Sequence, residues 1–284
     1  MSQPLVSVAD LAAHLADPAW RIFDCRHDLR QIDYGAQAYA QGHIRGAQFL
    51  HLDRDLSGKP TGRNGRHPLP DPVAFAAKMA ASGVGATTQV VAYDNEGGIF
   101  AARLWWLLRW LGHRHVAVLD GGLAAWKRAD QALATGTEQP RAADFAIAAD
   151  SLRLPKVDAD YVLEHIGTTE MLLIDARGPE RFRGENETLD PVGGHIPGAL
   201  NRHYVNNLDA SGCFFKPAGV LRNEFEALQG DRAASSVVQQ CGSGVTACHN
   251  LLAMELAGLS GSRLYAGSWS EWCSDPTRPI ATGA

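Results

Sequence analysis

The chain lacks the features of several large protein classes. Its 31 acidic residues outnumber its 26 basic ones, for a net charge of -5, so there is no basic excess with which to bind nucleic acid or an anionic membrane. It has no run of the roughly 18 to 20 apolar residues that a membrane span needs, and its first residues do not follow the basic-then-apolar pattern of a signal peptide. We therefore expect a cytoplasmic protein with neither nucleic acid nor a membrane as its partner.

Cysteine is also scarce, and its spacing argues against two kinds of site. The five cysteines are odd in number, and no two are spaced as Cys-x-x-Cys. This pattern indicates neither a disulfide framework nor a structural zinc site. We expect an important cysteine to act as a free thiol, with no metal and no resident cofactor. The five are Cys25, Cys213, Cys241, Cys248 and Cys273.

What the sequence does contain is an internal repeat in a chain of two-domain length. The 284 residues, 45% of them apolar and 20% charged, correspond to about two globular domains at roughly 150 residues each. Three motifs of the first half return in the same order about 150 residues later. They are apolar-apolar-Asp-x-Arg at 22–26 and 173–177, Gly-His-Ile-x-Gly-Ala at 42–47 and 194–199, and a segment ending in Trp at 120–126 and 266–272.

The pattern of apolar residues predicts an α/β architecture for both halves. Short apolar runs are typical of strands buried on both faces, and here they alternate with helical patterns. Such alternation predicts a mostly parallel sheet with helices on both faces in each half. The expected domains are residues 1–138 and 157–284, joined by a linker at 139–156 where the periodicity is lost. The expected strands include 21–25, 89–93 and 116–119, and the expected helices 73–82, 99–111 and 247–257.

The two copies of the repeat diverge where a strand ends and a helix begins. Alignment places Asp94 opposite Cys241, at the carboxyl end of a strand, where parallel sheets bind ligands. After Cys241, Gly242 and Gly244 permit backbone angles that turn successive N–H groups toward the sulfur, and the next helix adds the positive end of its dipole. Such a loop favours the thiolate form of Cys241 at neutral pH. The alternative is that Cys241 is a small, buried core residue.

With these motifs, the sequence resembles the tandem-domain rhodanese-type sulfurtransferases. The resemblance covers nearly the whole chain and rests on the Cys-Gly-Ser-Gly-Val-Thr-Ala loop at 241–247, the two Gly-His-Ile-x-Gly-Ala segments, and Gly-Ser-Trp-x-Glu-Trp at 267–272. Within the family, the loop is most similar to the 3-mercaptopyruvate type, in which Gly and Ser follow the cysteine. The thiosulfate type typically carries Arg and Lys there. The resemblance implies two rhodanese-like domains, the first without the catalytic cysteine.

The resemblance also implies transfer of a sulfane sulfur through a cysteine persulfide. Cys241 would take sulfur from 3-mercaptopyruvate, hold it as a persulfide without any other cofactor, and pass it to cyanide or a thiol. A thioredoxin-like protein or a low-molecular-weight thiol would be the natural acceptor. Main-chain amides of the loop would stabilise the anionic sulfur. The loop residues expected to bind in this way are Gly242, Gly244, Val245 and Thr246.

Two arginines of the second half are the expected substrate-binding residues. Arg181 matches the family's carboxylate-binding arginine, since a guanidinium binds a carboxylate through two parallel hydrogen bonds. Relatives with this loop usually carry a second arginine about nine residues later, where this chain has Asp190. Arg177 fits substrate binding and a structural ion pair equally well, because Arg26 repeats it in the first half.

A proton relay is the remaining expected part of the site. Ser243 would donate its hydroxyl to the substrate or to the departing enolate, or else cap the helix. Asp33 and His43 resemble the acidic residue and the histidine that relatives bring toward this serine. Because the Gly-His-Ile motif is duplicated, a structural role for His43 stays open. The segment Gly-Arg-His-Pro-Leu-Pro at 65–70 is predicted to be a loop, and no chemistry is assigned to it.

Several other functions stay open at this point. Thiosulfate could be the main donor, the protein could be a non-catalytic rhodanese-like binding protein, or Cys241 and Cys248 could form a redox sensor, although Cys248 fits the helix core better. A phosphatase of this architecture is disfavoured, because Ala247 stands where an arginine would bind phosphate. We expect 3-mercaptopyruvate to be preferred, because a glycine and a serine beside the cysteine offer no fixed positive charge for the thiosulfate dianion.

Overall fold

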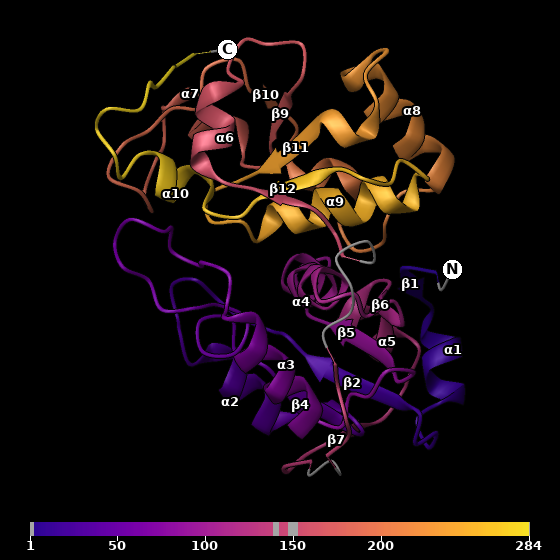
Figure 1. Ribbon diagram of the computed structural model, residues 1–284. Coiled ribbons are helices and arrows are strands. Elements are labelled where there is room, and N and C mark those ends of the chain that lie inside the picture. Colours follow the sequence, from indigo (N-terminus) through magenta and orange to yellow (C-terminus); the bar gives the residue numbers. More distant parts are fainter. Residues whose placement is uncertain (1–2, 139–141, 147–152, 284) are drawn as a thin grey trace. The chain divides into compact units, whose positions relative to one another are not determined.

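The structure divides into two units, each built around its own sheet (Figure 1). The computed structural model describes residues 3–138, 142–146 and 153–283, so half of the linker predicted at 139–156 lies outside the described residues. The units do not simply follow the order of the chain. Unit 1 comprises Met1–Gly58, Pro70–Leu154 and Asp209–Phe215, and unit 2 comprises Lys59–Leu69, Pro155–Leu208 and Lys216–Ala284.

Unit 1 contains a five-stranded sheet in which every pair of neighbouring strands is parallel. Its order is β1-β6-β5-β2-β4, with strands β1 (Leu5–Val6), β2 (Trp20–Asp24), β4 (Ala47–Phe49), β5 (Gln89–Tyr93) and β6 (Val116–Leu119). A separate antiparallel pair joins β3 (His43–Ile44) to β7 (Leu133–Ala134). The helices are α1 (Val8–Ala13), α2 (Tyr34–Gln41), α3 (Pro72–Ala81), α4 (Ile99–Trp110) and α5 (Gly122–Arg128).

Unit 2 repeats this parallel sheet. Its order is β10-β9-β11-β12-β8, with strands β8 (Lys156–Val157), β9 (Leu172–Asp175), β10 (Leu200–Asn201), β11 (Val237–Gln240) and β12 (Arg263–Tyr265). The helices are α6 (Ala159–Glu164), α7 (Pro179–Arg183), α8 (Ala218–Gln229), α9 (Thr246–Leu256) and α10 (Ser268–Trp272), with 3₁₀ turns η2 (Tyr204–Asn207) and η3 (Ala234–Ser236). Numbered along each unit, both sheets have the spatial order first, fifth, fourth, second, third strand, as a duplication requires.

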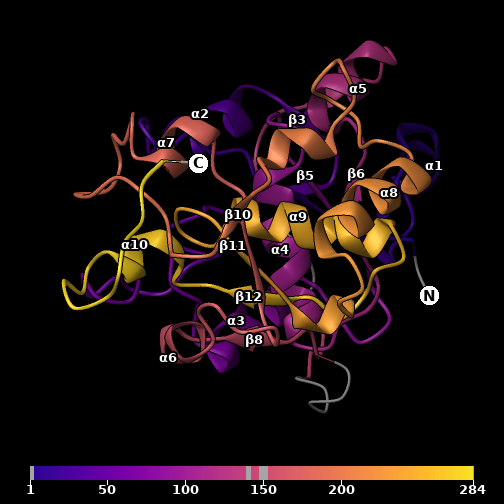
Figure 2. The same cartoon turned by 90° about the horizontal axis from the view of Figure 1, so that it is seen from above.

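Helices cover both faces of the unit 2 sheet. On one face, Trp269 and Trp272 of α10 pack with Leu173 and Tyr265 from the strands and with residues of α6 and α7. On the other face, α9 contacts β11 and β12, and alternate strand residues such as Val237 point that way. Figure 2 shows α9 beside α8, with which it is in contact. The predicted α/β fold with helices on both faces is therefore confirmed.

Unit 1 follows the same plan, and local sequence signals explain where its elements begin. Leu11 of α1 and Trp126 of α5 pack on one face of the sheet, while α4 contacts β5 and β6. Asp71 accepts a hydrogen bond from the Ala74 amide and precedes a proline, which fixes the start of α3. The predicted strands and helices agree with the observed ones to within one residue at each end. No helix in the described part of the chain is long and apolar enough to cross a membrane.

Candidate active site

In both units, the loop after the second strand is held by an arginine that binds an aspartate and a main-chain carbonyl. In unit 2, Nε and Nη2 of Arg177 donate to both oxygens of Asp175, and Nη2 also donates to the carbonyl of Gly194 at 2.6 Å. The Arg177 side chain is 1% exposed. Unit 1 has the same set of contacts between Asp24, Arg26 and Gly42. Since the arrangement is present in both copies, it supports the structural alternative for Arg177.

Cys241 lies between the end of β11 and the start of α9, in the loop that the repeat alignment singled out (Figure 1). Two hydrogen bonds fix its backbone: its amide donates to the Ser268 side-chain Oγ at 3.1 Å, and its carbonyl accepts from the Trp269 amide at 2.9 Å. The amide of Gly244 points at the sulfur and donates to Sγ at 3.1 Å. Cys241 is 2% exposed. The loop thus presents at least one inward N–H to the thiol, as predicted from the glycines.

Gly244 is required for this geometry. Its φ of +76° lies in the left-handed region, which is costly for residues that carry a Cβ. A Cβ at this position would also collide with the carbonyl oxygen of Ala266. The glycine therefore allows the chain to turn its amide back onto the sulfur.

A histidine that the sequence analysis left without a role contacts Ser243. Nδ1 of His67 lies 2.7 Å from Ser243 Oγ, and both residues are buried, at 5% and 6% exposure. His67 belongs to the segment Lys59–Leu69, which is part of unit 2. The neighbouring Arg66 amide donates to Ser270 Oγ of α10 at 3.0 Å, which anchors the segment beside the Cys241 loop.

Two further guanidinium groups converge on the Cys241 loop. Arg181 of α7 donates through Nε and Nη2 to Glu187, and its Nη2 lies 3.2 Å from Asp190 Oδ2. Nη1 of Arg66 bonds to the other oxygen of Asp190. Both guanidiniums come within 3.5 Å of the place that a Cβ on Gly242 would take. The loop itself carries no positive charge, but these arginines place two positive charges beside it. We expected 3-mercaptopyruvate to be preferred over thiosulfate because the cysteine would have no fixed positive charge beside it, and the structure does not support that reason.

The charges of this cluster shift pKa values in ways that keep it ionised. Burial alone lowers the pKa of Arg177, but the charges of Asp175, Glu187 and Cys241 raise it above its ordinary value. Burial raises the pKa of Glu187, yet hydrogen bonds from the Leu189 amide and Arg181 outweigh burial and leave that pKa below its ordinary value. The site therefore contains stable arginine cations held by carboxylates.

The remaining predicted residues take the following places. His43 is fully buried, stacks on Tyr39 and lies 2.9 Å from the Tyr39 carbonyl oxygen. Asp33 precedes α2, is exposed and pairs with Arg54 at 3.4 Å. These contacts lie within unit 1. The catalytic roles expected for His43 and Asp33 stay predictions.

The last residues of the loop enter the helix. Val245 is the N-cap of α9, and Thr246 is the first residue of that helix. Within the first turn of α9, the Cys248 thiol is fully buried and bonds to the Gly244 carbonyl oxygen at 3.2 Å. The contact of Cys248 with the loop backbone fits a packing role in the helix.

In unit 1, Asp94 occupies the place that Cys241 has in unit 2. Its carboxylate is fully buried and accepts four main-chain hydrogen bonds at 2.8 to 2.9 Å. Its carbonyl accepts from the Leu123 amide at 2.9 Å, as that of Cys241 accepts from Trp269. The four amides belong to Glu96, Gly98, Phe100 and Ala101.

One cluster of potential metal ligands occurs among the described residues, and it lies in unit 1. His27, His51 and Asp53 bring three ligand atoms within 4.8 Å of one another. However, Nδ1 of His51 already accepts the Asp53 amide at 3.1 Å, and its Nε2 lies 3.0 Å from the Ile32 carbonyl oxygen. A metal would have to displace the first of these bonds, so the cluster is not a preformed metal site.

Comparison with known proteins agrees with this architecture. The family model described as "Rhodanese-like domain" matches residues 7–129 and 158–275. A Pseudomonas aeruginosa protein named "Probable 3-mercaptopyruvate sulfurtransferase" is 49% identical over 284 residues, which covers 99% of this chain and 99% of that protein. A Bos taurus protein named "Thiosulfate sulfurtransferase" is 32% identical over 262 residues, covering 90% of this chain and 85% of that protein.

A solved structure leads to the same assignment. The crystal structure of SseA from Escherichia coli, described among the 3-mercaptopyruvate sulfotransferases, is 33% identical with a TM-score of 0.81, and the match covers 94% of this chain and 99% of that one. The family model accounts for most of the sequence in two copies, and the relatives are similar over nearly its full length. This protein therefore belongs to the rhodanese-like family, as a tandem-domain sulfurtransferase.

Proposed function

We propose that the protein transfers the sulfur of 3-mercaptopyruvate to a thiol or cyanide acceptor, with Cys241 as the nucleophile. The observation that carries the proposal is the set of groups around one sulfur atom. The Gly244 amide donates to Sγ of Cys241. Ser243 of the same loop is hydrogen-bonded to His67, and Arg181 lies next to Gly242. These groups supply what the reaction needs: an anion site, a proton relay and a carboxylate-binding cation.

The first half-reaction is a nucleophilic substitution at sulfur. The Cys241 thiolate attacks the donor's sulfur, an S–S bond forms, and the donor's C–S bond breaks with its electron pair passing to carbon as the pyruvate enolate. The proton on the donor thiol moves through Ser243 and His67 to the enolate carbon, which gives pyruvate. Cys241 keeps the sulfur as an anionic persulfide. Atoms and charge balance without any other reactant or cofactor.

The second half-reaction restores the enzyme. An acceptor thiolate, or cyanide, attacks the outer sulfur of the persulfide, and the S–S bond breaks with its electron pair returning to Cys241. The products are a low-molecular-weight or protein persulfide, or thiocyanate. A thioredoxin-like protein is a suitable acceptor, because it presents an exposed and nucleophilic thiol.

Thiosulfate is the second candidate donor, and a specific observation favours keeping it. Arg66 and Arg181 place two cations beside Gly242, where a dianion would be attracted. The Ser243–His67 pair, in contrast, favours 3-mercaptopyruvate, because only a carbon leaving group needs a proton.

Comparison of the two donors tests the proposal. We expect kcat/KM with cyanide as acceptor to be at least about tenfold higher for 3-mercaptopyruvate than for thiosulfate, because the proton relay assists only the first. A preference for thiosulfate would make the second candidate the function. Absence of turnover with both donors would refute sulfur transfer from either.

A further inference from the structure

We propose that Arg66 is a donor-binding residue, and that Arg66 and Arg181 together bind the donor's carboxylate at Gly242. This inference rests on the proposed function, because the donor is taken to be an α-keto acid. It adds to that function a residue from the segment Lys59–Leu69, which neither the repeat alignment nor the loop motif indicates.

The missing side chain of Gly242 allows two guanidinium groups to come close to the loop. Nη2 of Arg66 lies 2.9 Å from the position that a Cβ on Gly242 would take, and Nη2 and Nη1 of Arg181 lie 3.4 and 3.5 Å from it. Two guanidiniums from different segments of unit 2 therefore meet at the residue that follows the nucleophile. A larger residue at 242 would need the same space.

Asp190 holds both guanidiniums in place. It is nearly buried, with 2% side-chain exposure, and each of its oxygens bonds to one arginine: Oδ1 to Arg66 and Oδ2 to Arg181. Glu187 binds a second edge of Arg181. The arginines are thus fixed before a donor arrives, which reduces the entropy lost on binding.

Each arginine keeps one terminal nitrogen for a ligand. The Leu189 carbonyl and Asp190 engage Nη1 of Arg66, while Glu187 and Asp190 engage Nε and Nη2 of Arg181. Among the described residues, neither Nη2 of Arg66 nor Nη1 of Arg181 makes a hydrogen bond. A guanidinium has five N–H donors, so an arginine that binds a carboxylate of the protein can still donate hydrogen bonds to the carboxylate of the sulfur donor.

Exposure separates these two arginines from Arg177. The side chains of Arg66 and Arg181 are 29% and 23% exposed, whereas that of Arg177 is 1% exposed. A donor can therefore reach the first two, while Arg177 is closed off by Asp175 and Trp269. Two accessible, planar cations match the two oxygens of a carboxylate.

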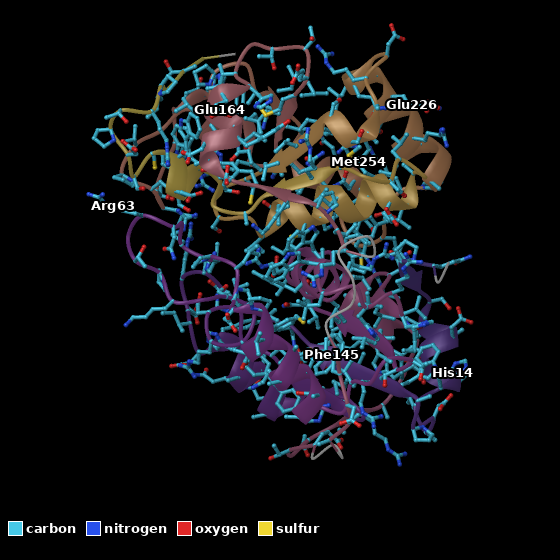
Figure 3. All side chains as sticks on the ribbon, viewed as in Figure 1. His14, Arg63, Phe145, Glu164, Glu226 and Met254 are labelled. Carbon is cyan, nitrogen blue, oxygen red and sulfur yellow. The ribbon has the colours of Figure 1, made fainter. Side chains whose placement is uncertain are left out.

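Variants of Arg66 test the inference. We expect Arg66→Ala to raise KM for 3-mercaptopyruvate and the inhibition constant of pyruvate by about tenfold to a hundredfold, the range for loss of a charge-assisted hydrogen bond, with kcat within about threefold of wild type. Arg66→Lys should recover part of the loss. The matched control is Arg63→Ala, an exposed arginine near the tip of the same segment (Figure 3), which should leave both constants unchanged.

Alkylation of Cys241 gives a readout that does not depend on turnover. Iodoacetate and iodoacetamide are similar in size, but only iodoacetate carries a carboxylate. We expect Arg66→Ala to lower the iodoacetate rate at Cys241 by about tenfold and to leave the iodoacetamide rate unchanged. If sulfur transfer itself is the wrong function, this rate ratio still reports on the arginine pair.

Two results would overturn the inference. One is an Arg66→Ala or Arg66→Gln enzyme with wild-type KM and a wild-type ratio of the two alkylation rates. The other is an equal fall in kcat and in both alkylation rates, which would assign Arg66 a structural role in placing His67. The melting temperatures of the variants show whether the comparison is made on folded protein.

Discussion

The loops at Asp94 and Cys241 share one backbone design but hold different side chains. In both, a carbonyl at the strand end accepts an amide from the start of a later helix, from Leu123 in unit 1 and Trp269 in unit 2. In unit 1 the enclosed group is a carboxylate that takes four amide hydrogen bonds. In unit 2 it is a thiol that takes one from Gly244.

The same loop design therefore holds a carboxylate in unit 1 and, on the function that we propose, a reactive sulfur in unit 2. Burial raises the pKa of Asp94, and the four amide bonds counteract that rise. The Asp94 carboxylate therefore completes its own site. On the function that we propose, the cysteine in the same position of unit 2 accepts a further sulfur, and amide donors of the loop would stabilise its charge.

Replacing the nucleophile should give the largest effect. We expect Cys241→Ser to lower turnover from every donor by at least about a thousandfold, because a serine hydroxyl cannot form a persulfide. The measurement is steady-state thiocyanate production. Appreciable turnover by this variant would mean that another residue is the nucleophile.

The matched change in unit 1 should affect stability instead. Asp94→Ala leaves four amides, three of them buried, without their acceptor, and we expect the free energy of unfolding to fall by about 3 kcal/mol. Turnover per folded molecule should stay within about twofold of wild type. Denaturant unfolding and kinetics on the same preparation separate the two effects.

A variant with the cysteine moved to unit 1 tests whether the loop alone is sufficient for sulfur transfer. We expect the double variant Asp94→Cys with Cys241→Ser to stay inactive, because Glu96 stands where unit 2 has Ser243 and the His67 and Arg66 contacts belong to unit 2. Rescue of thiocyanate production above the Cys241→Ser level would show that these supporting residues are dispensable.

Loss of the relay should affect one donor only. We expect His67→Gln to lower kcat with 3-mercaptopyruvate by about a hundredfold, because proton transfer to the enolate is slowed. With thiosulfate the change should stay within about threefold, since sulfite leaves without a proton. An equal loss for both donors would indicate that His67 only positions Ser243.

The smallest expected effect is on stability at acid pH. The units differ here, because unit 1 has a buried histidine where unit 2 has a leucine. His113 follows Gly112 in unit 1, at the place of Leu259 after Gly258 in unit 2. Burial lowers the pKa of His113 from 6.5 to about 4. Its neutral form is thus favoured by folding, so its contribution is complete above pH 6.5 and is lost as the pH falls toward 4.

A variant isolates this contribution. Between pH 7 and pH 4.5, wild type should lose about 2 kcal/mol of stability more than His113→Leu, which has no group to titrate at that position. Denaturant unfolding at several pH values measures the difference. Parallel pH profiles for the two proteins would contradict the assignment.

The repeat and the fold could be predicted from the sequence, because they depend on local patterns. Apolar periodicity located β5 and α9, and duplicated motifs placed Cys241 opposite Asp94. The glycines of the loop predicted its inward amide, since glycine adopts a φ of +76°, as at Gly244, far more readily than residues with a Cβ.

The contacts of the segment Lys59–Leu69 could not be predicted in this way. Its glycines and prolines indicate a loop, but the sequence pattern does not predict which element a loop packs against. His67 and Arg66 are far in sequence from Ser243 and Asp190, and they meet only through tertiary structure. The adjacent Arg66 and His67, in a loop bounded by Gly65 and Pro68, were the available signal.

The central claim is that Cys241 receives the donor's sulfur, and intact-mass analysis tests it most directly. After reaction with one equivalent of 3-mercaptopyruvate and no acceptor, we predict a gain of about 32 Da that peptide mapping places on Cys241, together with one equivalent of pyruvate. Release of pyruvate with no gain in mass, or a gain located on another cysteine, would contradict the account.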